Sequence, residues 1–191
     1  APVIVAQTGD ATSASITEQV GQIGLTTADS ASGTLTLKDV DLSDTHTVTV
    51  VRSSTTWNQV GTGGTTIALG GAPSATTGSY GTAATGGAQS AVLAVLDNAL
   101  GVSVVKDSTG SGTGQISWNF SAADSNFDFL AQGETLVVTY NVQVTDSNNG
   151  NSNVVPVTIT ITGTNDAPVI VAQTGDATSA SITEQVGQIG L

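Results

Sequence analysis

The chain has 191 residues, of which 38% are hydrophobic, and fifteen acidic against three basic side chains give it a formal net charge of −12. This balance excludes nucleic acid as a partner and disfavours an anionic membrane surface, because both would require a basic surface. No apolar run approaches the roughly 20 residues that cross a bilayer, so we expect no direct membrane insertion. The absence of cysteine excludes disulfides and a cysteine nucleophile.

Short segments in which apolar and polar residues alternate dominate the chain and predict β-strands. A hairpin over 134–146 and 155–161 has the clearest pattern, because its apolar residues share one face and a polar turn at 146–153 separates the two runs. In chain order, the other predicted strands are 2–6, 14–18, a strand through Leu35 and Leu37, a strand through Val48 and Val50, and a strand through Ile116, Trp118 and Phe120.

The middle of the chain is patterned differently. Residues 53–87 are rich in Gly, Thr, Ser and Ala around isolated anchors such as Trp57 and Tyr80, which predicts a long loop or a weakly patterned hairpin. Residues 90–100 predict one short helix, and 107–114 predict a turn or a disordered tip. Many short strands with almost no helix indicate an all-β fold, an antiparallel β-sandwich with Greek-key connections.

The first 25 residues, APVIVAQTGDATSASITEQVGQIGL, recur without change at 167–191, an offset of 166 residues. We therefore expect residues 1–166 to form one complete repeat with an insertion at about 53–90. Residues 167–191 are expected to be the start of the next identical repeat, either completing a sheet or hanging unpaired. Identical neighbouring units suit a protein whose function is length or copy number, as in a stalk, a filament or a multivalent adhesin.

Catalytic signatures are weak, so we do not expect an enzyme. His46 is the only histidine and is expected at the surface, and no serine has a G-x-S-x-G setting. Paired carboxylates can hydrolyse glycosides, but sugar clefts need aromatic side chains and the chain has only seven.

The acidic residues are placed where a hard cation could bind. Asp39, Asp41 and Asp44 form a D-V-D-L-S-D cluster on a turn, and several oxygen ligands on a short polar loop are typical of Ca²⁺ sites. More acids stand at predicted strand ends, which gather at the two ends of a sandwich; these are Glu18, Glu134, Asp146 and Asp166. The alternative is that all of them are ordinary solvated turn acids.

Two stretches resemble a known family, namely SGTLTLKDVDLSD at 32–44 and AADSNFDFLAQGETLVVTYNVQVTDSNNGNSNVVPVTITITGTNDAPVI at 122–170. They are similar to the VCBS-type, cadherin-like tandem repeats of giant bacterial RTX adhesins, which act in biofilm formation. The T-G-T-N-D-A-P signature at 162–168 is the most specific part of the match. The resemblance implies an Ig-like or cadherin-like sandwich that is secreted to the bacterial cell surface. It also implies long arrays of units, with Ca²⁺ bound at the linkers between them.

The resemblance also implies a set of metal ligands in this chain. Asp39 and Asp41 correspond to a D-x-D pair that serves the linker on the N-terminal side of the unit. The remaining positions that match the pattern are Glu18, Glu134, Asp146, Asn165 and Asp166. One departure from the pattern is that the linker begins Thr162-Gly163-Thr164, without a further aspartate, which suggests fewer or weaker ions at each junction.

Three functions remain open on the sequence. The leading hypothesis is a structural extender repeat for cell adhesion, whose partners are neighbouring repeats of the same chain and whose array projects a region that binds cell-surface or matrix ligands. The second is a carbohydrate- or cell-binding module that uses the 53–90 insertion, with Trp57 and Tyr80 exposed. The third is a self-assembling filament or surface-layer subunit in which 167–191 completes a neighbour's sheet.

Overall fold

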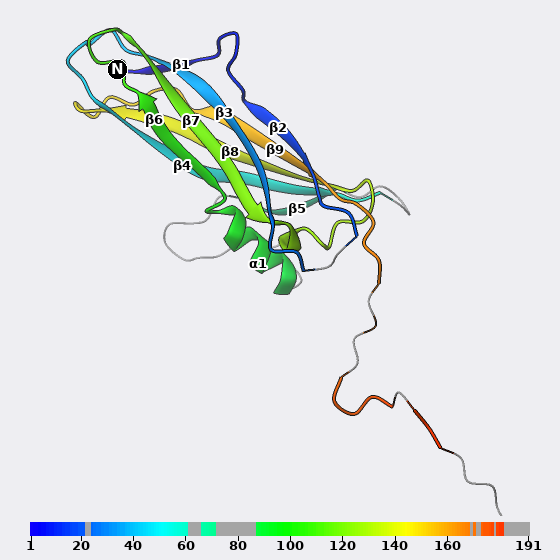
Figure 1. Cartoon of the computed structure of the whole chain (residues 1–191). Helices are drawn as coiled ribbons and strands as arrows, with labels where there is room; N and C mark the ends of the chain where they lie inside the picture. The colour runs from blue at the N-terminus through cyan, green and yellow to red at the C-terminus, as the bar shows by residue number, and fades with distance from the viewer. Residues whose placement is uncertain are drawn as a thin grey trace, which may run out of the picture.

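The computed structural model describes residues 1–21, 24–60, 66–71, 87–168, 170, 173–177 and 179–181. Within these residues the chain is mostly strand, and Figure 1 shows the strands stacked in two layers along a common axis. The elements, in chain order, are β1 Val3–Val5, β2 Ser13–Thr17, β3 Ala28–Lys38, β4 His46–Asn58, β5 Thr66–Gly71, α1 Gly87–Leu96, β6 Leu100–Lys106, β7 Thr113–Ala123, the 3₁₀ turn η1 Asp124–Asn126, β8 Thr135–Asp146 and β9 Val155–Thr162.

The strands form one sheet in the order β1-β3-β7-β6 and a second in the order β2-β9-β8-β4-β5. Every pair is antiparallel except β2 with β9, which is parallel. The chain crosses repeatedly between the sheets, so sequence neighbours are often not sheet neighbours. This is the arrangement of an immunoglobulin-type sandwich. In the usual lettering of that fold, β1, β3, β7 and β6 correspond to strands A, B, E and D of one sheet, and β9, β8 and β4 to strands G, F and C of the other. The predicted all-β fold class is confirmed.

The predicted hairpin is the pair β8 and β9, and it forms the centre of one core face. Leu136 pairs with Ile161 and Val138 with Ile159, and all four side chains are buried. The alternation of apolar and polar residues predicts the buried face correctly here, because successive side chains of a strand point to opposite faces of the sheet. From the other sheet, the side chains of β3 and β7 complete the core, including the fully buried Trp118.

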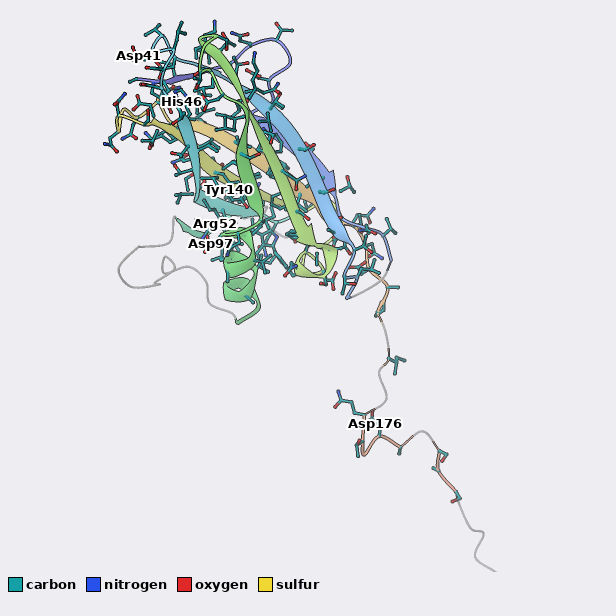
Figure 2. The ribbon with its side chains drawn as sticks, turned by 60° about the vertical axis from the view of Figure 1, so that its left-hand side comes forward. Asp41, His46, Arg52, Asp97, Tyr140 and Asp176 are labelled. Atoms are coloured by element: carbon teal, nitrogen blue, oxygen red, sulfur yellow. The ribbon has the colours of Figure 1, made fainter. Side chains whose placement is uncertain are left out.

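The predicted helix is present, but it occupies Gly87–Leu96 rather than 90–100. It ends there because Leu100 already begins β6 and pairs with Phe120. Two contacts fix its C-terminal end to the second sheet: the Tyr140 hydroxyl donates to the Leu96 carbonyl at 2.8 Å, and the Arg52 Nε donates to Asp97 at 2.6 Å (Figure 2).

The 53–87 region is built as a hairpin in its first part. β4 continues to Asn58 and pairs with β5, whose Leu69 is fully buried. The prediction for Tyr80 falls outside the described residues. No helix in the described part of the chain is long and apolar enough to span a membrane.

The sequence copy at the C-terminus differs in structure from the original. Residues 1–21 contribute β1 and β2, whereas the described residues between 163 and 181 contain no strand and extend away from the sandwich (Figure 1). Among those residues, Ile170 is 100% exposed.

Candidate functional site

The strand ends gather the acidic side chains at the two ends of the sandwich. The N-terminal pole, as defined here, contains Ala1 and the turns at 39–44, 107–112 and 146–150. The C-terminal pole contains Glu18, the segment 124–128 and the linker 163–166. Of the three basic residues, Lys38 and Lys106 end strands β3 and β6 towards the N-terminal pole, and Arg52 binds Asp97 in the middle of the molecule.

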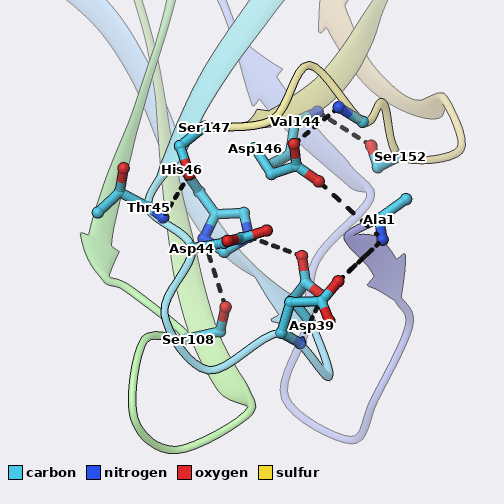
Figure 3. A network of polar contacts seen from close by, with 12 residues as sticks. Ala1, Asp39, Asp44, Thr45, His46, Ser108, Val144, Asp146, Ser147 and Ser152 are labelled. Carbon is cyan, nitrogen blue, oxygen red and sulfur yellow. Dashed lines mark hydrogen bonds and ion pairs between the residues drawn. The ribbon is translucent and has the colours of Figure 1, made fainter.

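At the N-terminal pole the predicted D-V-D-L-S-D acids do come together. One carboxylate oxygen from each of Asp39, Asp41 and Asp44 lies within 4.8 Å of the others. Asp146 joins them across the amino group of Ala1, which lies 3.6 Å from the Asp41 carboxylate and 4.0 Å from those of Asp39 and Asp146 (Figure 3).

His46 is buried in this pole, so its predicted surface position is wrong. Its side chain is fully shielded, with Nε2 3.0 Å from the Asp39 carboxylate and Nδ1 in contact with that of Asp107. Because each ring nitrogen faces a carboxylate, the geometry requires a donor at both nitrogens, which only the imidazolium supplies. Although burial opposes the shift, the two carboxylates raise the pKa of His46 above its ordinary value. The turn at 107–112, which brings Asp107 here, is closed by a backbone hydrogen bond from the Gly112 N–H to the Ser108 carbonyl at 2.7 Å.

Most acids of the N-terminal pole already have hydrogen-bond donors. Asp39 accepts from the Asp41 backbone N–H at 3.0 Å, and both carboxylate oxygens of Asp44 accept from the Asn148 side-chain amide. Asp146 accepts from the backbone N–H groups of Asn148 and Gly150 at 2.8 and 2.7 Å. Against the effect of burial, the hydrogen bonds of His46 and Asp41 hold the pKa of Asp39 below its usual range. The cluster is therefore neutralised in part by the protein itself.

The C-terminal pole differs from the N-terminal pole in that its described acids have no cationic partner. Carboxylate oxygens of Glu18, Asp128 and Asp166 lie within 4.8 Å of one another. Asp124 is fully buried beside them, and no ion pair among the described residues involves any of these four acids.

Each of three acids at this pole is anchored by one oxygen and unpartnered at the other. Glu18 Oε2 accepts from the Thr164 N–H at 3.0 Å, Asp124 Oδ1 from Gln19 N–H at 2.7 Å, and Asp128 Oδ2 from Gly24 N–H at 2.8 Å. Their second oxygens are buried and find no hydrogen-bond partner within the described structure. Buried polar atoms are nearly always paired in proteins, so this convergence needs an explanation.

The electrostatics of the C-terminal pole reflect this crowding. Burial, more than any other cause, raises the pKa of the Glu18 carboxyl to about 7. The hydrogen bond from Thr164 opposes that rise, and the charges of Asp166, Asp124 and Asp128 add to it. Burial also raises the pKa of Asp29, to about 6, with Asp124 as a further cause. Such a site is disposed to exchange protons for a cation.

Two predicted ligands have other surroundings. Glu134 stands at the start of β8, and its Oε2 accepts hydrogen bonds from the Trp57 indole at 2.9 Å and the Ala131 N–H at 3.1 Å. Asn165 is exposed next to Asp166. The Trp57 ring is half-buried and meets Phe129 edge to face at 5.2 Å, so its N–H and part of its surface are already engaged.

Sequence reasoning missed Asp29, Asp124 and Asp128. Asp124 directly follows β7, so it is a strand-end acid of the kind that the prediction selected elsewhere. Asp128 lies four residues later, after the 3₁₀ turn, and no periodic pattern marks it. Asp29 lies inside β3, where only the fold brings it to the pole.

Comparison with known proteins adds little beyond the fold. No family model and no curated protein matches the chain. Similar solved structures include the ASH/PapD-like domain 7 of human CEP192, at a TM-score of 0.38 and 10% identity over 86% of this chain and 92% of that one. Another is the CooA pilin subunit from enterotoxigenic Escherichia coli, at a TM-score of 0.34 and 12% identity over 85% and 96%. At these values neither structure informs function, and the fold assignment follows from the strand topology described above.

Proposed function

We propose that this chain is a structural extender unit of a bacterial cell-surface adhesin, in which Ca²⁺ at the ends of each unit stiffens a tandem array. The observation that carries the proposal is the C-terminal pole, where Glu18, Asp124 and Asp128 each present a buried oxygen without a partner. Secretion to the cell surface follows from the family resemblance.

The donor set suits calcium on chemical grounds. It consists of carboxylate oxygens alone, and Ca²⁺ takes six to eight oxygen ligands in flexible geometry, whereas zinc sites favour nitrogen and sulfur. Backbone N–H groups hold one oxygen of each carboxylate, so the other is oriented before any ion arrives. A bound divalent ion would also remove the repulsion between these acids. Asp166 belongs to the same cluster and Asp29 lies beside Asp124, so both are placed to contribute further oxygens.

The sequence repeat suggests how such a site would join two units. Ala167 is the counterpart of Ala1, and in the chain it directly follows Asp166. The Ala1 nitrogen lies 3.6–4.0 Å from the carboxylates of Asp41, Asp39 and Asp146. In an array, Asp166 would therefore come beside the N-terminal pole of the following unit. At the same time, the Gly21 N–H donates to Asp166 at 3.2 Å and holds this aspartate against its own unit.

This geometry gives the linker a mechanical role. Without ions, the end-to-end distance of an array with flexible linkers grows only as the square root of the number of units. The clustered carboxylates also repel one another. An ion that binds acids of both units would fix their relative orientation, so that reach grows in proportion to unit number. Extracellular modules bind calcium with dissociation constants of about 10⁻⁴–10⁻³ M, which suits a permanently calcium-rich environment.

Thermal unfolding in EDTA and across a calcium titration tests the proposal. A ligand that binds only the native state raises the melting temperature with its concentration, and 10 mM calcium at the affinity above adds about 1–3 kcal/mol. We expect Asp128→Asn to abolish most of this rise. The charge-matched Asp10→Asn should retain it, because the half-buried Asp10 carboxylate accepts from Gln7 and Thr36 and belongs to neither acidic cluster. No calcium-dependent rise in the parent chain, or an equal rise with magnesium, would contradict the proposal.

A further inference from the structure

β2 pairs only with β9, and the two strands run in the same direction. Their pairing extends from Ser13 with Thr158 to Thr17 with Thr162, and the strands lie side by side along the sandwich (Figure 1). We propose that this pair, here called the β2–β9 clamp, is the part of the unit that resists tension along an array, and that the cation of the C-terminal pole stabilises it. The inference rests on the proposed function, because it takes the units to be joined end to end.

The direction of the two strands decides how tension acts on them. In a tandem array, tension enters a unit ahead of β1 and leaves it after β9. β2 and β9 both run towards the C-terminal pole, where Thr17 is paired with Thr162. The incoming chain therefore pulls the start of β2 towards the N-terminal pole, while the outgoing chain pulls the end of β9 the opposite way. The strands can separate only by sliding along each other, so all of their hydrogen bonds resist the load together.

β1 lies ahead of the clamp on the path of the load, and it is held by a shorter pairing. Three residues, Val3–Val5, pair with β3, and Asn153 adds two hydrogen bonds to Ile4 at 2.9 and 3.0 Å. Detachment of β1 would free residues 3–12, at most about 36 Å of chain, and would pass the load to β2. Ala11 ties the entry of β2 to the first sheet, since it donates to the Thr34 carbonyl at 3.0 Å and accepts from the Trp118 indole at 2.8 Å.

The acids of the C-terminal pole connect the far ends of the same two strands. Glu18 directly follows β2, and its N–H donates to the Thr162 carbonyl at 3.0 Å while its Oε2 accepts from the Thr164 N–H at 3.0 Å. Its carboxylate lies within 4.8 Å of that of Asp166, in the segment that follows β9. Sliding by one residue displaces the strands by about 3.3 Å, which would break these contacts. A cation bound between Glu18 and Asp166 would therefore have to leave before the strands could slide.

This requirement sets the size of the calcium effect under load. Only molecules without the ion could unfold by sliding, so the rate of unfolding would fall by the factor 1 + [Ca²⁺]/Kd. At 10 mM calcium and a dissociation constant of about 10⁻⁴–10⁻³ M, the folded lifetime under load should increase about 10- to 100-fold. A load that peels the strands apart from the N-terminal pole breaks the first hydrogen bonds one at a time, far from the ion. Calcium should hardly change the load at which peeling begins.

The test is a force measurement on the full-length chain with optical tweezers, in EDTA and in 10 mM calcium. The chain has no cysteine, so introduced cysteines attach handles at defined points. Handles at the two termini load the clamp in shear. Handles at Thr8→Cys and Val154→Cys, two exposed positions that precede β2 and β9, peel the pair from the N-terminal pole.

In EDTA, the chain pulled by its termini should withstand a higher load than the chain pulled by Thr8→Cys and Val154→Cys. It should first lengthen by the short step of β1 and then unfold in a main step that releases on the order of 500 Å of chain, the length of residues 3–162. In calcium, the lifetime should increase for the terminal handles and stay nearly the same for the peeling handles.

Two proline variants test the hydrogen bonds of the clamp. The Thr158 N–H donates to the Thr12 carbonyl at 2.9 Å, and Glu18 N–H donates to Thr162, so even-numbered residues of β2 face β9. Consecutive residues of a strand direct their backbone groups to opposite sides, so Ala14 faces β9 and Ser15 faces the open edge. Proline has no N–H to donate. We expect Ala14→Pro to shorten the lifetime under terminal load and the matched Ser15→Pro to retain it.

Equal loads for the two handle geometries in EDTA would overturn the clamp, and so would a Ser15→Pro effect as large as that of Ala14→Pro. The comparison of geometries uses the parent strands, so it decides the matter even where Ala14→Pro prevents β2 from forming. A rise in melting temperature with calcium, without a longer lifetime under terminal load, would overturn the role of the cation in the clamp. A higher load for the terminal handles, with no effect of calcium on lifetime or melting temperature, would support the clamp and contradict the proposed function.

Discussion

Replacing Glu18 by glutamine separates the two roles of this carboxylate, because it should stabilise the metal-free protein and abolish its response to calcium. The glutamine carbonyl can keep the hydrogen bond from the Thr164 N–H. Its amide group replaces the unpartnered Oε1 and can donate to a neighbouring carboxylate such as Asp128 or Asp166. The substitution thus removes a charge that the fold buries at a cost, with little change in shape.

The magnitude follows from the pKa of Glu18, which the fold raises from 4.5 to about 7. A pKa difference of one is worth about 1.4 kcal/mol, so ionised Glu18 lowers the stability of the metal-free protein by about 3 kcal/mol at pH 8. The sign follows from linkage: the folded state holds the proton more tightly, so metal-free stability falls as pH rises from about 4.5 to about 7. For a domain of this size, Glu18→Gln should raise the melting temperature by roughly 6–12 °C at pH 8.

The assay is calorimetry of both proteins in EDTA at pH 4 and pH 8, and in 10 mM calcium at pH 8. The difference between the two proteins should nearly vanish at pH 4, because Glu18 is then protonated in the folded state and mostly protonated in the unfolded state. Calcium should raise the melting temperature of the parent chain by roughly 3–10 °C and leave that of Glu18→Gln nearly unchanged. The control Asp97→Asn weakens the bond to Arg52. It should lower the melting temperature in EDTA and in calcium by similar amounts, so the rise that calcium causes should be retained. A lower melting temperature for Glu18→Gln in EDTA, or an undiminished calcium response, would refute the reasoning.

Two further predictions concern the fold. His46→Ala should destabilise the protein by about 2–4 kcal/mol at pH 6, because it leaves the buried carboxylate of Asp39 and the partly exposed one of Asp107 without their shared cation. Urea denaturation measures this, and an effect below about 0.5 kcal/mol would show that the imidazolium contributes little. Gly33→Ala should cost about 1–3 kcal/mol, because its new methyl group would lie 2.5 Å from the Trp118 ring, and unchanged stability by the same measurement would mean that the ring moves aside freely.

The sequence by itself determined the fold class and most of its strands. Alternation is a local property, and in Leu136, Val138 and Tyr140 it marks the buried face of β8 because strand side chains point to opposite faces in turn. The duplicated segment and the acidic turn at 39–44 were equally plain. The predicted helix at 90–100 lies a few residues later than the observed one. The reason is that Leu100 pairs with Phe120 in β6, and this long-range contact ends the helix early.

Only the tertiary structure decided which charges meet. Asp124 lies 95 residues after Asp29 and 106 after Glu18 in the chain. The three acids converge because β3, β7 and β2 all have an end at the C-terminal pole. The burial of His46 likewise depends on Asp107, which a separate turn brings to it. Glu134 was predicted as a metal ligand because it precedes a strand, but in the fold its carboxylate accepts a hydrogen bond from the Trp57 indole. Local pattern determines how a strand is built, whereas the partners of a charge depend on strand order and register, which arise from packing across the whole chain.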